Sequence, residues 1–200
     1  MLVIGLTGPS GAGKGVVAEI LSTLGLPVID ADQVYHELLV PPSSCLDALT
    51  AHFGVRILDG DGTLNRKALG QLVFGNSTAL ARLNEITHRY VMEEIHARMQ
   101  RLRRANYRAV VLDAPQLFEA GAERDCNVII SVLADKRIRL ERILARDGIS
   151  VEAALARMEA QKSDEFFRTH SNYIIENNGS PDQLYPLIKR ILTETGVLTP

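Results

Sequence analysis

The sequence predicts an α/β fold in which one five-stranded parallel sheet is surrounded by helices and interrupted by a helical insertion. Five short segments are apolar and rich in β-branched residues without polar alternation, as strands buried on both faces of a parallel sheet are. Helical spacing alternates with these segments, which favours repeated strand-to-helix units. The stretch from residue 41 to residue 104 is mostly helical in its periodicity.

The first two units come early in the chain. Residues 2–7 (LVIGLT) predict a strand, and a glycine-rich turn leads into a helix over 14–24. The buried face of that helix is expected at Val17, Ile20, Leu21 and Leu24. A short strand at 27–30 then precedes a helix over 31–39. The insertion over 41–104 follows, with turns expected at DGDGT and FGNS.

The second half returns to the same alternation. Strands are expected at 107–115, 126–134 and 172–177. An arginine-bearing helix at 135–148 and a further helix near 150–162 separate the last two strands. The chain closes with a helix over about 181–194, capped by Ser180.

Composition predicts a compact protein without a polyanionic partner. The 200 residues are 46% apolar and 23% charged, which fits one globular unit. A net charge of −2 supplies no positive field for nucleic acid or an anionic membrane. The N-terminus has no basic leader and only a short apolar run, so we expect neither export nor a membrane span. Cys45 and Cys126 are expected as buried thiols in a reducing cytoplasm.

The glycine-rich turn predicts a phosphate site. Gly8, Gly11 and Gly13 allow backbone N–H groups to turn toward phosphate oxygens, and Lys14 reaches the outer phosphates. The alternative is a glycine-rich turn without a ligand, but the strand before it and the helix after it favour nucleotide binding. Gly15 and Val16 lack the hydroxyl that such loops use on magnesium, so nearby acids must complete any metal site.

Three acids at strand ends are the candidates. Asp113 ends an apolar strand, where it would face the metal directly or through water; its alternative role is a turn cap. Asp30 and Asp32 end the second strand at the edge where open α/β sheets bind ligands. One could orient an acceptor hydroxyl or take its proton while the other touches metal-bound water, or one could cap the next helix.

Three arginines share one helix. Arg139, Arg142 and Arg146 could close over a transferring phosphoryl group, which favours a lid over about 136–165. The alternative is a solvated face on which Glu141 pairs with some of them. His88 lies on a long helical stretch, where a lone histidine is more often structural than catalytic.

Taken together, these segments resemble the dephospho-CoA kinase family over nearly the whole chain. The matching segments, in chain order, are IGLTGPSGAGKGVVAEILSTLGLPVIDAD, DGTLNRKALGQLVFGN, LARLNEITH, LDAPQLFEAG, RLERILARDG and NYIIENNGS. The resemblance implies a P-loop kinase core over about 1–40 and 105–200, with an acceptor-binding insertion over 41–104. It also implies transfer of the ATP γ-phosphate to the 3′-hydroxyl of dephospho-CoA, with Mg²⁺, as the last step of coenzyme A synthesis.

Site residues follow from the same resemblance. The residues that would bind ATP are Gly8, Gly11, Ala12, Gly13, Lys14, Gly15, Val16 and, near the base, Asn177. Asp32 would be the base or orienter, and Arg142 or Arg146 would stabilise the transferring group. The residues that would shape the acceptor pocket are Asp30, His88, Pro115, Leu117, Phe118 and Glu119.

The chain departs from the family's pattern at two places. The family's loop normally ends in Gly-Lys-Ser/Thr-Thr, whereas this loop ends in Gly-Lys-Gly-Val; adenylate kinases also carry glycine after the loop lysine. The histidine of ITH is followed here by Arg89 instead of proline. Two alternatives therefore stay open: a small-molecule kinase with another acceptor, and a nucleotide-binding protein with weak or lost catalysis.

Overall fold

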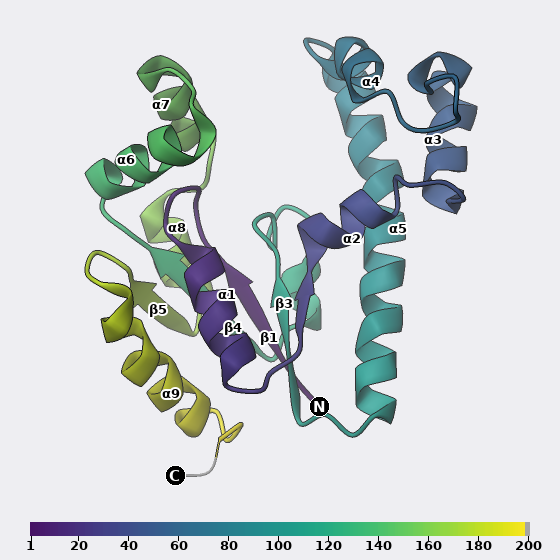
Figure 1. The fold of residues 1–200 in the computed structure, drawn as a ribbon. Coiled ribbons are helices and arrows are strands. Elements are labelled where there is room, and N and C mark those ends of the chain that lie inside the picture. The colour runs from purple at the N-terminus through teal and green to yellow at the C-terminus, as the bar shows by residue number, and fades with distance from the viewer. Residues whose placement is uncertain (199–200) are drawn as a thin grey trace. The chain divides into compact units, whose positions relative to one another are not determined.

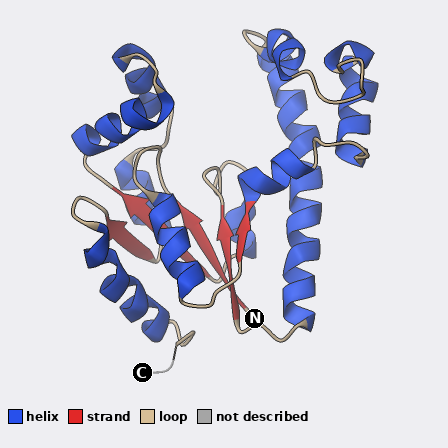
Figure 2. Ribbon diagram, in the orientation of Figure 1, coloured by secondary structure: helices blue, strands red, loops and turns tan. Residues whose placement is uncertain are grey.

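The computed structural model describes residues 1–198 and contains a five-stranded sheet. Its strands are β1 (Leu2–Thr7), β2 (Val28–Asp30), β3 (Ala109–Asp113), β4 (Val128–Leu133) and β5 (Tyr173–Glu176). They lie in the order β2-β3-β1-β4-β5, with β1 pairing in parallel with β3 and β4, and β4 in parallel with β5 (Figure 2). The predicted α/β class with a five-stranded parallel sheet is confirmed.

Helices join the strands and form most of the rest of the described chain (Figure 1). They are α1 (Lys14–Thr23), α2 (Ala31–Glu37), α3 (Ser44–Phe53), α4 (Arg66–Val73), α5 (Ser77–Arg104), α6 (Lys136–Asp147), α7 (Val151–Glu159), α8 (Asp164–His170) and α9 (Leu184–Glu194). Short 3₁₀ turns occur at Val55–Ile57, Ala122–Asp125 and Pro181–Gln183.

The sheet's core explains its apolar segments. Every residue of β3 is buried, and Ile4 and Leu6 of the central strand β1 are fully buried. Helices α1 and α9 pack side by side against this core (Figure 1). Val17 and Leu21 are the fully buried residues of α1, whereas the other two predicted positions of its inner face are only half-buried.

The chain forms two compact units, one of residues 1–29 with 102–200 and one of residues 30–101. The first contains the glycine-rich loop and most of the sheet. The second has its own apolar core, built around α3, α4 and α5, with Leu49 and Ile57 fully buried. This unit begins at Asp30, earlier in the chain than the insertion expected over 41–104.

Three local predictions differ from the structure. The C-terminal helix begins at Leu184, because a 3₁₀ turn occupies Pro181–Gln183, and the Ser180 side chain makes no capping hydrogen bond there. Helix α8 was not predicted; Ser163 caps it through a hydrogen bond from the Phe166 N–H. Cys45 is buried as expected, but Cys126 is only half-buried, and both are free thiols.

Within the described residues, no helix is long and apolar enough to span a membrane.

Candidate active site

The loop between β1 and α1 has a backbone that only glycine fits. Gly8, Gly11 and Gly13 have φ angles of 147°, 79° and 91°, a region that side chains with a Cβ rarely adopt. A Cβ on Gly8 would lie 2.2 Å from the Val132 carbonyl oxygen, and one on Gly13 would lie 2.1 Å from the Asn177 amide nitrogen. The loop therefore packs closely on its neighbours, and its shape depends on these glycines.

Side chains from distant segments hold three consecutive loop carbonyls. Arg139 Nε donates to the Ser10 oxygen at 3.0 Å. Arg142 Nη1 donates to the Gly11 oxygen at 3.4 Å and to the Ala12 oxygen at 3.2 Å. The buried amide of Asn177 also donates to the Ala12 oxygen, at 2.8 Å. Asn177, expected near the ATP base, thus contacts the loop.

Helix α1 begins at Lys14 without a side-chain cap among the described residues and without an acidic residue in its first turn. The first N–H groups of a helix have no intrahelical acceptor and carry positive potential, so this end suits a phosphate. Lys14 Nζ forms an ion pair with Asp113, which ends β3 and is 5% exposed. An ammonium has three donors, so Lys14 can keep this contact while it binds a phosphate oxygen.

Magnesium would find few protein ligands here. Gly15 and Val16 are exposed in the first turn of α1, and neither has a hydroxyl. Among the described residues, no group of three or more His, Cys, Asp or Glu side chains could hold a metal ion. Because Mg²⁺ commonly takes only one or two carboxylates besides water and phosphate oxygens, Asp113 beside the loop fits such a site.

The arginines of α6 differ from one another. Arg139 is 6% exposed and its burial lowers its pKa, an effect that Asp164 opposes. Arg146 is exposed and makes a hydrogen bond of 3.4 Å to the Ser10 hydroxyl, but its stronger partner is Asp147, at 2.7 and 2.9 Å. Hydrogen bonds from Arg146 and then Arg157 lower the pKa of Asp147 to about 2. Arg142 is the half-buried one, directed at the loop.

The segment after β3 contributes mostly to packing. Leu117 is fully buried, and the Pro115 oxygen accepts a 3.3 Å hydrogen bond from the buried Thr7 hydroxyl. Phe118 contacts the ring of Phe166 edge to face, with centroids 5.1 Å apart. Glu119 is exposed. Of the four residues of this segment that were expected in the acceptor pocket, Pro115, Phe118 and Glu119 retain accessible surface, whereas Leu117 belongs to the core.

The remaining predicted residues lie in the second unit. Asp30 Oδ1 accepts hydrogen bonds from the N–H groups of Asp32 at 2.9 Å and Gln33 at 3.0 Å, so Asp30 caps α2. This leaves the exposed Asp32 carboxylate, in the first turn of α2, as the acid that can face an acceptor. His88 is half-buried on α5. The roles of these residues toward the loop stay predictions.

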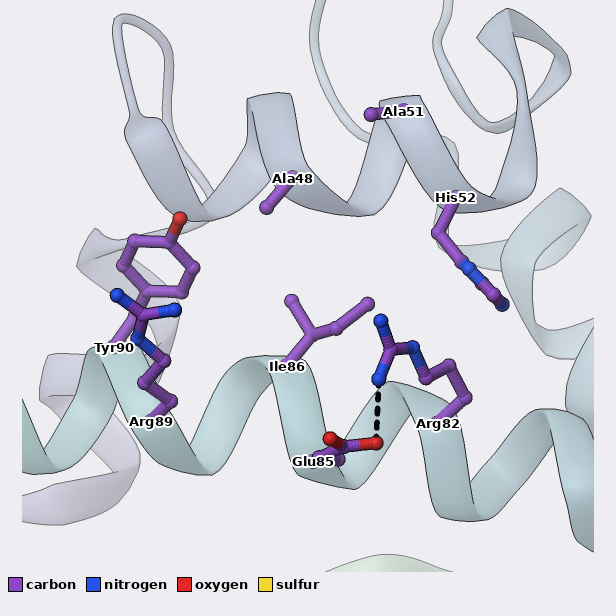
Figure 3. Close-up of a pocket in the computed structure, with 8 residues that line it drawn as sticks. All are labelled: Ala48, Ala51, His52, Arg82, Glu85, Ile86, Arg89 and Tyr90. Carbon is purple, nitrogen blue, oxygen red and sulfur yellow. Dashed lines mark hydrogen bonds and ion pairs between the residues drawn. The ribbon is translucent and has the colours of Figure 1, made fainter.

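A pocket of about 510 Å³ lies within the second unit, between α3 and α5 (Figure 3). Arg82, which pairs with Glu85 at 2.6 Å, lies across the pocket from α3, and Ile86 points into it. His88 is not among the lining residues. Because residues two apart on a helix point in widely different directions, His88 and Ile86 face different surroundings. The pocket contains none of the site residues predicted from the sequence.

Sequence reasoning missed Gln161 as a contributor to the loop. The Gln161 side chain accepts a 3.0 Å hydrogen bond from the Ser10 N–H, although 151 residues separate them. No sequence motif links Ser10 with Gln161, because their contact depends on how the chain after α7 returns to the loop. The one available signal was the turn after α7, where a lone amide precedes the Ser163 cap of α8.

Comparisons with known proteins agree over most of the chain. Residues 2–183 match the model of a protein family described as dephospho-CoA kinase. A dephospho-CoA kinase of Geobacter sulfurreducens is 39% identical over 191 residues, covering 96% of this chain and 97% of the relative. One of Halalkalibacterium halodurans is 36% identical over 193 residues, covering 94% of this chain and 96% of the relative.

Solved structures give the same picture. The crystal structure of a Thermus thermophilus protein is similar with a TM-score of 0.81 and 33% identity, covering 96% of this chain and 97% of that one. Dephospho-CoA kinase from Campylobacter jejuni follows with a TM-score of 0.72 and 29% identity, covering 96% of each chain. Shikimate kinase from Acinetobacter baumannii, at 17% identity and a TM-score of 0.54, covering 98% of this chain and 93% of that one, shares the fold.

Proposed function

We propose that this chain, which belongs to the dephospho-CoA kinase family, transfers the γ-phosphoryl group of ATP to the 3′-hydroxyl of dephospho-CoA, giving coenzyme A and ADP. It is an enzyme of the ATP-dependent phosphotransferase class, and its acceptor is a small molecule. The observation that carries the proposal within the structure is the Lys14 ion pair with Asp113 at the uncapped start of α1.

ATP is assigned to the loop of residues 8–16. The outer phosphates would be bound by the N–H groups at the start of α1 and by the Lys14 ammonium, because both carry positive potential. Arg142, half-buried beside the loop, is the side chain best placed to neutralise charge on the transferring group. Phosphoryl transfer depends mainly on such positioning and charge neutralisation.

The acceptor-binding residues are proposed from the family resemblance. The exposed Asp32 carboxylate would orient the ribose 3′-hydroxyl or accept its proton, since Asp30 is engaged as the cap of α2. His88, Phe118 and Glu119 would contribute to binding. Mg²⁺, held by phosphate oxygens, water and Asp113, would supply further charge neutralisation. A cytoplasmic location and the absence of nucleic-acid partners stay predictions from composition.

The direct test is ADP release by the purified protein with ATP, Mg²⁺ and dephospho-CoA. AMP and shikimate serve as alternative acceptors, and a reaction without acceptor gives the background hydrolysis. We expect turnover on dephospho-CoA and background rates elsewhere. Turnover on AMP or shikimate alone would overturn the substrate, and ATP binding without turnover would overturn the activity.

Lys14→Met supplies the matching test of the site. Removing the ammonium should lower turnover by about a hundredfold or more, in the range found when one group that stabilises transition-state charge is lost. The exposed Lys67 on α4 offers a control, and Lys67→Met should retain the wild-type rate. Equal rates for Lys14→Met and the wild type would remove the loop from the mechanism.

A further inference from the structure

Ser10 has both of its backbone groups bound by side chains from far along the chain. Its N–H donates to Gln161 Oε1 at 3.0 Å, and its carbonyl oxygen accepts from Arg139 Nε at 3.0 Å. The two contacts bridge 151 and 129 residues of sequence. The peptide groups before and after Ser10 are therefore each fixed by one side chain outside the loop.

Arg139 and Gln161 also bind each other. Arg139 Nη2 donates to Gln161 Oε1 at 3.3 Å, and Nη1 donates to Asp164 Oδ1 at 3.3 Å. The Arg139 side chain is 7% exposed, whereas that of Arg137 on the same helix is 81% exposed. A guanidinium is costly to bury unless its donors are satisfied, so this burial indicates a network built around Ser10.

The planar trans peptide makes these contacts directional. In such a peptide, the carbonyl of one residue and the N–H of the next point in opposite directions. Holding the Ser10 carbonyl toward α6 therefore aims the Gly11 N–H away from α6. Likewise, the Asn177 amide holds the Ala12 carbonyl toward itself and so points the Gly13 N–H away from Asn177. Both N–H groups belong to the loop of residues 8–16, to which ATP is assigned.

We propose that Arg139 and Gln161 are positioning residues that preset the phosphate loop for ATP by fixing the peptide groups on both sides of Ser10. The proposal rests on the assignment of ATP to this loop. Arg139 is thereby excluded from following the transferring phosphoryl group, because its buried side chain uses Nε, Nη1 and Nη2 on Ser10, Asp164 and Gln161, whereas Arg142 is half-buried and binds the loop through Nη1. The close approach of α6 agrees, since a Cβ on Gly11 would lie 2.5 Å from the Arg139 carbonyl oxygen.

Gln161→Met tests the proposal, because it keeps the length of the side chain and removes the acceptor. A loop that ATP itself must order binds ATP more weakly, while the acceptor is unaffected. We expect the KM for ATP and the Kd of a non-hydrolysable ATP analogue, measured by calorimetry, to rise about fivefold, the usual effect of one hydrogen bond. The KM for dephospho-CoA should stay unchanged and kcat should stay within about twofold.

Gln100→Met, at an exposed position of α5, is the matched control and should bind the analogue like the wild type. Arg139→Lys removes the guanidinium that holds the Ser10 carbonyl oxygen, and Arg137→Lys on the same helix is its matched control. Because both residues act on Ser10, the double variant Gln161→Met with Arg139→Lys should be less impaired than the product of the two single effects.

Two results would overturn the proposal. One is an unchanged Kd for the analogue in Gln161→Met together with a lower Tm, since the contact would then serve stability alone. The other is a double variant, Gln161→Met with Arg139→Lys, in which the increase in the Kd of the analogue equals the product of the increases in the two single variants. Neither result depends on the acceptor, because analogue binding is measured without it. Failure of this inference is therefore distinguishable from failure of the proposed activity, which the acceptor experiment tests on the wild-type protein.

Discussion

Neighbouring glycines in the loop meet opposite constraints. Gly13 has a φ of 91° and lies against Asn177, so a side chain there would displace the amide that holds the Ala12 carbonyl. Gly15 lies in the first turn of α1, and among the described residues no heavy atom beyond its chain neighbours and the surrounding helix backbone would lie within 4 Å of an added Cβ. Gly13 is thus required by the fold, whereas Gly15 is not.

Gly15→Ser should be tolerated and should change turnover by less than about threefold. The change removes the backbone freedom of glycine from a helix, which favours folding by up to about 0.5 kcal/mol. If Mg²⁺ is held by phosphates, water and acids, the new hydroxyl adds little to the rate. Turnover at saturating Mg²⁺ and Tm are the measurements. Gly13→Ala is the contrasting variant, with weaker ATP binding. An increase of a hundredfold in Gly15→Ser would mean that the natural metal site is defective.

At the scale of elements, the inner strands β1, β3 and β4 were predictable because they are mostly buried and therefore continuously apolar, and the shorter edge strands β2 and β5 keep an apolar centre. Short elements were not predictable, because a few residues are too few to show a periodic pattern. Helix α8 has only seven residues, and its Ser163 cap with acidic residues in the first turn was the available sign. The cap expected at Ser180 failed because the chain first makes a 3₁₀ turn there.

The site was predictable in part for a related reason. Lys14 and the glycines stand in one contiguous motif, and their loop is found where the motif places it. The contacts of Asn177 and Gln161 with the loop join residues more than a hundred positions apart. Such contacts depend on the completed fold, and no local spacing encodes them. The catalytic roles assigned from the sequence stay predictions.

Helix α6 presents arginines of different function, and Arg142→Met should separate them. Arg142 is half-buried beside the loop and is proposed to neutralise charge in the transition state, so its loss should lower kcat by about a hundredfold. Arg139 is proposed to act on ATP binding, so its variants should raise the KM for ATP instead. Steady-state kinetics with both substrates varied measure the difference.

Arg137→Met is the control on the same helix, because the Arg137 side chain is 81% exposed and pairs with Glu141 at the surface. It should retain wild-type kcat and KM, since exposed pairs of this kind contribute little. A variant at Arg142 that raised the KM for ATP without lowering kcat would contradict the assignment and make Arg142 another support of the loop.

At the scale of the whole molecule, each of the two compact units contains one thiol. Cys126 belongs to the unit with the phosphate loop, and Cys45 lies in the core of the unit of residues 30–101. Burial raises the pKa of Cys126 to about 12 and that of Cys45 to about 11. At pH 8 a thiol with a pKa of about 11 is deprotonated in about one molecule in a thousand. Both thiols should therefore react slowly with iodoacetamide until their unit opens.

Pulsed alkylation in increasing urea, with each thiol located by mass spectrometry, then measures the opening of each unit. A non-hydrolysable ATP analogue at a hundred times its Kd should stabilise the loop-bearing unit by about 2.7 kcal/mol. With an m-value of about 2 kcal/mol/M, the Cys126 midpoint should rise by more than 1 M urea, and the Cys45 midpoint by less.

The sign of the pH effect provides the control. Because burial raises both thiol pKa values above the unfolded value, raising the pH from 8 to 9 increases the thiolate fraction of either native cysteine about tenfold. The unfolded thiol loses its proton first, so the same change lowers the free energy of unfolding by about 0.7 kcal/mol, and midpoints that report opening should fall by only a few tenths of a molar urea. Midpoints that move together with the analogue would contradict independent opening. They would show that the unit of residues 30–101 unfolds only with the loop-bearing unit, so that an ATP analogue bound at the loop stabilises both units.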